Sequence, residues 1–108
     1  MIVRLKTVTG LPEHVDLGIS LFRDTVAGCC VDVVGFRAGW FLVDRDSGRT
    51  VTLTMWDDRD ALAEALGNLA DRIASDEHVA ETVRRVNANG MRTDTFEVAE
   101  QIAPRPRQ

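Results

Sequence analysis

Apolar and polar residues alternate in some stretches of the chain and follow a helical period in others, and these stretches predict its elements. Residues 2–9 are rich in β-branched side chains and predict a strand. Beyond Gly10, apolar residues recur at helical spacing over 12–29 and predict an amphipathic helix. The leucines that follow Asp60 begin a second helix, which a row of valines continues or restarts. Residues 91–99 predict the last strand.

The middle of the chain predicts a β-hairpin. Residues 35–44 and 49–56 flank the turn signal Asp46-Ser47-Gly48. A hairpin centred between Asp46 and Ser47 gathers six apolar residues on one face: Ala38, Trp40, Leu42, Val51, Leu53 and Met55. Its other face pairs Phe41 with Thr52, Gly39 with Thr54, and Arg37 with Trp56. A slip of one residue would mix the two sets, so the pattern selects this register.

The element order predicts an α+β fold, a ferredoxin-like βαββαβ sandwich with an antiparallel four-stranded sheet. We expect the six apolar residues to pack against the helices. The opposite face then stays uncovered and carries Arg37, Phe41, Val43, Thr52, Thr54 and Trp56. Such a mixed face is typical of an interface or a ligand site. A second copy would cover it by two-fold symmetry, and the two sheets would enclose a cavity for a small ligand.

Composition bounds the class of protein. With 108 residues, 44% of them apolar, the chain predicts one domain over 1–102 and a disordered tail over 103–108, where prolines interrupt regular structure. A net charge of -4 argues against nucleic acid or a membrane surface as partner. No apolar run is long enough for a membrane span, and the N-terminus does not resemble a signal peptide, so we expect a cytoplasmic protein.

Few residues suggest metal or cofactor chemistry. Cys29 and Cys30 are sequence neighbours, so we expect free thiols at a helix end. Their spacing to the two histidines matches no zinc motif, and no phosphate-binding glycine loop is present, so we expect neither a metal nor a cofactor. His78, among acidic residues, is expected at a solvated helix start. Haem binding through His78 or His14 is a lesser alternative.

One segment adds a family resemblance. The run GFRAGWFLVDRDSGRTVTLTMWDDRDALAEAL resembles the core of the dimeric α+β barrel proteins, the antibiotic biosynthesis monooxygenase group. The matching features are Gly35-Phe36, Met55-Trp56-Asp57-Asp58 and the helix from Ala61 to Leu66. The resemblance implies a homodimer with Trp56 pointing into a cavity. Haem-degrading members carry an Asn on the first strand and a His on the later helix; Lys6 and Leu66 stand in those regions here, so haem degradation is not implied.

Two functions are consistent with these features. The first is a cofactor-independent monooxygenase that acts on a small aromatic or polyketide-like substrate. Its catalytic residues would be Trp56, Arg37 and Thr54, and its substrate-binding residues Phe41, Thr52 and Trp56. The second is a non-catalytic dimeric ligand-binding or interaction protein of the same fold. The absence of tyrosine, which such oxygenases often use near the cavity, favours the second.

Overall fold

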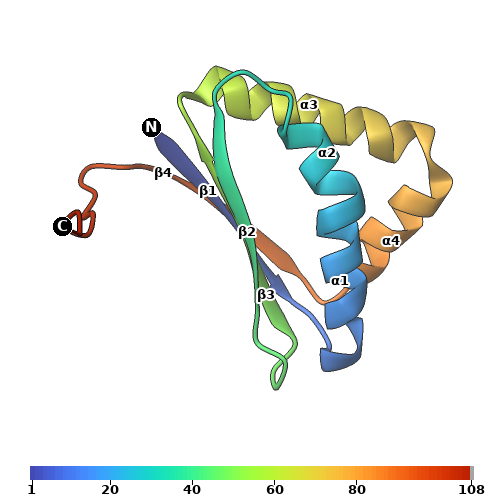
Figure 1. Cartoon of the computed structure of the whole chain (residues 1–108). Coiled ribbons are helices and arrows are strands. Elements are labelled where there is room, and N and C mark those ends of the chain that lie inside the picture. The colour runs from blue at the N-terminus through green and yellow to red at the C-terminus, as the bar shows by residue number, and fades with distance from the viewer. Residues whose placement is uncertain (108) are drawn as a thin grey trace.

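Four antiparallel strands form a single sheet in the computed structural model, which describes residues 1–107 (Figure 1). The strands are β1 (Ile2–Thr9), β2 (Phe36–Val43), β3 (Arg49–Trp56) and β4 (Met91–Glu97), in the order β2-β3-β1-β4. This order, with helical crossovers between β1 and β2 and between β3 and β4, is that of a ferredoxin-like sandwich. The predicted α+β βαββαβ fold is confirmed.

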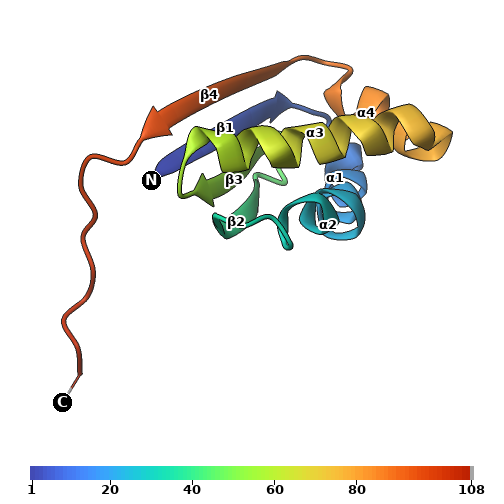
Figure 2. The same ribbon diagram turned by 90° about the horizontal axis from the view of Figure 1, so that it is seen from above.

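The helices lie together on one face of the sheet, as the two views show (Figures 1 and 2). The first crossover is one helical run of four parts: η1 (Pro12–His14), α1 (Val15–Leu21), η2 (Phe22–Val26) and α2 (Ala27–Cys30). The predicted helix over 12–29 is therefore present, with a π-helical turn at η2 inside it. Such turns occur often at functional sites.

The second crossover contains α3 (Arg59–Ser75) and α4 (Glu77–Asn87). Each helix begins at an aspartate whose carboxylate accepts backbone N–H groups. Asp58 accepts from Ala61, and Asp76 accepts from His78 and Val79. The sequence Ser-Asp-Glu around Asp76 therefore restarts a helix rather than continuing one, because its carboxylate caps a new N-terminus.

The predicted hairpin register is confirmed over most of its length. Trp40 lies opposite Leu53, Leu42 opposite Val51, and Phe41 opposite Thr52. Gly48, at φ +80°, supplies the turn conformation that residues with a Cβ rarely adopt.

The predicted pairing of Arg37 with Trp56 is wrong. A β-bulge between Phe36 and Ala38 brings Phe36 opposite Trp56. The bulge leaves Arg37 outside the regular pairing. Apolar alternation could not reveal it, because an inserted residue changes the pairing only at the open end of the hairpin.

The predicted assignment of the two sheet faces is also wrong. The face with Phe41, Thr52, Thr54 and Trp56, expected to be open, lies under the helices, and Trp56 is only 1% exposed. The face expected to be buried is the open one: Trp40 and Leu42 are each 47% exposed. The hand of the crossovers, not hydrophobicity, selects the covered face, and here both faces carry large apolar side chains.

Two clusters of buried side chains join sheet and helices. One surrounds Trp56 with residues from β1, α2 and α3, and the other joins Val8 of β1 to Leu21 and Val86. The open face of the sheet continues across β1 and ends on β4 at Phe96, which is 53% exposed. The protein thus has one face of the sheet packed against the helices and one apolar face that points outward.

The chain leaves the sheet after β4. Residues 98–107 contain no helix or strand and extend away from the body (Figure 2). The predicted tail over 103–108 falls in this segment, apart from residue 108, which lies outside the described residues. Within residues 1–107, no helix has the length and apolarity needed to cross a membrane.

Candidate functional site

The candidate site lies between the sheet and the helices and centres on Trp56, the last residue of β3. Its indole N–H donates a hydrogen bond to Thr54 Oγ1 at 2.9 Å. Its ring packs against Phe36, with ring centroids 5.0 Å apart. Since Thr54 uses an oxygen lone pair for Trp56, its own hydroxyl proton can serve another acceptor.

Two small cavities adjoin this pair. The first, about 30 Å³, is lined by Arg4, Val26, Cys29, Cys30, Thr52, Thr54, Trp56, Leu62, Ala65, Leu66 and Leu69. The second, about 50 Å³, is lined by Arg4, Lys6, Val8, Gly18, Leu21, Phe22, Val26, Phe41, Thr52, Leu69 and Val86. The cavities share Arg4, Val26, Thr52 and Leu69, so they lie side by side. Each has room for a few water molecules.

A stacked aromatic pair forms the wall of the second cavity. Phe41 of β2 stacks on Phe22 of η2, with centroids 5.5 Å apart. A Cβ on Gly18 would stand 2.9 Å from Phe41 Cζ, so the lack of a side chain at this position makes room for the Phe41 ring. The π-helical turn therefore brings an aromatic side chain of the helix layer against the sheet beside the cavity.

Two cations from β1 line the cavities, and the sequence analysis did not propose them as site residues. Arg4 lines both cavities and Lys6 the second. Burial lowers the pKa of both groups, and the charge of Arg4 lowers that of Lys6 further. The signal was present in the alternation Ile2, Arg4, Lys6, Val8, which places both cations on the face whose ends are buried.

The nearest thiol is neutral. Burial, then the neighbouring Cys29, raises the pKa of Cys30 to about 11. Burial also raises the pKa of Cys29. Both cysteines are free and buried, as the sequence predicted, and near neutral pH they contribute no negative charge to the cavities.

Four of the five predicted site residues come together here. Trp56 and Thr54 line the first cavity, Phe41 lines the second, and Thr52 lines both. Arg37 does not join them. Its exposed guanidinium forms an ion pair with Asp57 at the end of the hairpin.

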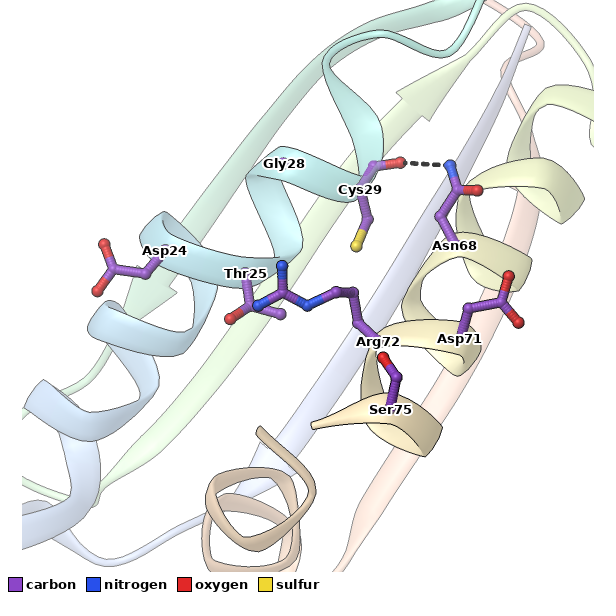
Figure 3. Close-up of a pocket in the computed structure, with 8 residues that line it drawn as sticks. All are labelled: Asp24, Thr25, Gly28, Cys29, Asn68, Asp71, Arg72 and Ser75. Carbon is purple, nitrogen blue, oxygen red and sulfur yellow. Dashed lines mark hydrogen bonds between the residues drawn. The ribbon is translucent and has the colours of Figure 1, made fainter. Parts of the chain in front are cut away.

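A larger hollow lies on the outer surface between α2 and α3 (Figure 3). It measures about 350 Å³ and is open to solvent. Arg72 extends across it toward Thr25 and Cys29, and Asn68 Nδ2 donates to the Cys29 carbonyl at 3.2 Å. Cys29 lines both this hollow and the first inner cavity.

The histidines take no part in the inner cavities. The backbone N–H of His78 donates to the capping carboxylate of Asp76 at 3.0 Å, at the start of α4. Across residues 1–107, no group of three or more His, Cys, Asp or Glu side chains could hold a metal ion.

Comparison with known sequences finds relatives of part of the chain. No family model matches the sequence. Uncharacterized proteins from two strains of Mycobacterium tuberculosis are 32% identical over 74 residues, which is 66% of this chain. The chain spans about a third of the length of these relatives, 31%.

Solved structures match almost the whole chain. A monooxygenase from the gene ActVA-Orf6 of Streptomyces coelicolor, in complex with nanaomycin D, has a TM-score of 0.73 at 15% identity, over 96% of this chain and 92% of that one. A variant of SnoaB, a cofactor-independent oxygenase of Streptomyces nogalater, has a TM-score of 0.64 at 19% identity, over 95% of this chain and 97% of that one. A variant of MhuD with two manganese protoporphyrins per active site has a TM-score of 0.67 at 18% identity, over 96% and 100%. The chain therefore has the fold of the antibiotic biosynthesis monooxygenases, as its sequence resemblance predicted.

Proposed function

We propose that the protein is a cofactor-independent monooxygenase that acts on a small aromatic substrate held between the sheet and the helices. The observation that carries this proposal is that Trp56, Thr54, Thr52 and Phe41 line two adjoining cavities beneath the helices. The fold, which solved oxygenases share, supports it.

The chemistry needs little from the protein beyond position and charge. A hydroxyanthrone-type ring, once deprotonated, supplies the electrons that reduce oxygen: its CH₂ carbon becomes a carbonyl, and the second oxygen atom leaves as water. The protein orients the ring and stabilises the oxyanion that develops on it. Trp56 offers a flat wall for the ring, and the Thr54 hydroxyl, held by the indole N–H, donates to the oxyanion.

A polycyclic substrate requires the helix layer to move away from the sheet. Cavities of about 30 and 50 Å³ are far below the volume of a drug-sized ligand site, about 300 Å³ or more. This small volume favours a second candidate function, a non-catalytic protein of the same fold that binds a small ligand.

Oxygen uptake separates the two functions. We expect the wild-type protein to consume oxygen with a hydroxyanthrone substrate and release the quinone in equal amount. Trp56→Phe should lower the rate by about tenfold or more, a change of about 1.4 kcal/mol in the barrier. Trp40→Phe is the matched control, because Trp40 lies on the opposite, open face. Ligand binding without turnover would favour the second function, and equal rates in both variants would contradict the role of Trp56.

We also propose that the protein is a homodimer in which the open sheet faces of two copies pack together. The face is apolar at Trp40, Leu42 and Phe96, each about half exposed in the single chain. A contiguous apolar surface of this kind is typical of an interface. In such a dimer the cavities stay on the far side of each sheet from the interface, so each copy keeps its own site.

A further inference from the structure

The floor of the inner cavities is a polar patch built by cross-strand pairing. Arg4 of β1 lies between Thr54 of β3 and Thr95 of β4. Two residues further along β1, Lys6 lies between Thr52 and Thr93. Because alternate residues of a strand share a face, both cations and the threonines beside them share the side of the sheet that carries the helices.

No acid balances these two charges. The seven ion pairs within residues 1–107 involve arginines other than Arg4, and none involves Lys6. The nearby thiols are neutral, since burial raises their pKa. The side chains that line the two cavities thus carry two positive charges and no negative one.

Placing Arg4 and Lys6 side by side in a partly buried region costs free energy of folding unless a counter-charge is present. Partial burial of a charge without a counter-ion destabilises the folded protein, and two like charges repel each other. Lys6 is also the single lysine of the chain, so lysine is not simply a common choice for its surface. An anion beside the two cations would offset this cost.

We propose that Arg4 and Lys6 bind the anionic oxygen of the ligand, which is an aromatic carboxylate or phenolate. The proposal rests on the function above for its aromatic ligand, and it holds for both the catalytic and the non-catalytic candidate. Arg4 can donate in a planar fork to two oxygens or to one, and Lys6 supplies a compact charge beside it. The hydroxyls of Thr52 and Thr54 lie in the same cavities and can complete the hydrogen bonding.

An anion bound to Arg4 and Lys6 leaves two positions for the aromatic ring. With its oxygen on β1, an aromatic ring would extend toward Trp56 in one direction or toward the Phe22–Phe41 stack in the other. In an oxygenase the same contacts would favour the deprotonated form of a phenol, which is the form that reacts with oxygen. The anion site thereby supplies the charge stabilisation that Arg37, outside the cavities, does not.

The test compares two probes of equal shape and different charge. Benzoate and benzamide are titrated by calorimetry, and by fluorescence in a Trp40→Phe background that leaves Trp56 as the single indole. We expect benzoate to bind at least tenfold more tightly than benzamide. Arg4→Met and Lys6→Met, which keep an unbranched stem and remove the charge, should each weaken benzoate at least tenfold and leave benzamide unchanged. Arg85→Met, an exposed cation on α4, is the matched control and should change neither.

The outcomes separate this proposal from the proposed function. Equal affinity for the two probes, or benzoate affinity unaffected by both substitutions, would overturn the anion site. If benzoate does not bind, formate is titrated instead, because this smaller anion fits the cavities at the size they have in the structure. Formate-induced NMR shifts at Lys6 and Thr52 that vanish in Arg4→Met would sustain the anion site and contradict an aromatic ligand; no shifts would overturn it. Benzoate binding without oxygen uptake on a hydroxyanthrone would contradict only the monooxygenase.

Discussion

At the residue scale, Lys6 is the side chain whose position has the clearest energetic consequence. Burial and the charge of Arg4 lower its pKa from the ordinary lysine value of 10.5. In the unfolded chain the amine has its ordinary pKa. Between the two pKa values the unfolded state therefore binds more protons than the folded state, and the free energy of unfolding rises with pH. Below that window the full cost of a charged, partly buried lysine is present.

This cost predicts that Lys6→Met is more stable than the wild type at pH 7. The advantage should shrink as the pH rises toward 10.5, where the wild-type amine loses its charge in both states. Urea unfolding of the two proteins at a series of pH values measures the difference, and comparing them removes the contribution of the cysteines. A lysine that served the fold through an ion pair would give the opposite sign at pH 7.

At the element scale, a side-chain hydrogen bond joins the short helix α2 to α3. Asn68 Nδ2 donates to the carbonyl of Cys29, a residue that also lines the first cavity (Figure 3). We expect Asn68→Ala to lower the free energy of unfolding by about 1 kcal/mol, the typical contribution of one hydrogen bond. Because the substitution removes a hydrogen bond that α2 makes to α3, the amide protons of α2 should exchange with solvent faster. Hydrogen–deuterium exchange over residues 27–33 measures this.

Asn89→Ala provides the control for that experiment. Asn89 is an exposed residue just beyond α4, far along the chain from α2. It should leave exchange over residues 27–33 unchanged. Faster exchange in Asn68→Ala would identify α2 as the part of the helix layer that can move to admit a ligand, and equal exchange would contradict that view.

The strands also show which features of the fold could be predicted from the sequence. The bounds of β1 and the pairing of Trp40 with Leu53 follow from local signals, namely alternation and turn residues. The covered face does not, because Trp40 and Trp56 are equally apolar and lie on opposite faces. Only the three-dimensional hand of the crossovers distinguishes them. The bulge that displaces Arg37 has no hydrophobic signature either, because the inserted residue changes the pairing only at the open end of the hairpin.

The candidate site shows a different limit of prediction from sequence. Trp56 was singled out by a resemblance and Thr54 by its position on the same face, and both line one cavity. Arg4 and Lys6 were not proposed, because charged residues in an alternating strand ordinarily indicate the solvent side. That rule does not hold for Arg4 and Lys6, which line the cavities beneath the helices.

At the scale of the whole molecule, the open sheet face predicts the assembly. In a two-fold interface each substitution occurs twice, so one charge introduced at the centre of the face places two charges in apolar surroundings. We expect Trp40→Glu to weaken self-association at least tenfold, measured by sedimentation at micromolar concentration, where the wild type should have the mass of two chains. Val34→Glu introduces the same charge at a position that is 91% exposed and should leave the dimer intact.

The cavities lie on the other side of the sheet, so monomeric Trp40→Glu should still bind benzoate. Loss of benzoate binding together with the dimer would instead mean that the second copy helps to form the site, and a monomeric wild type would contradict the interface itself.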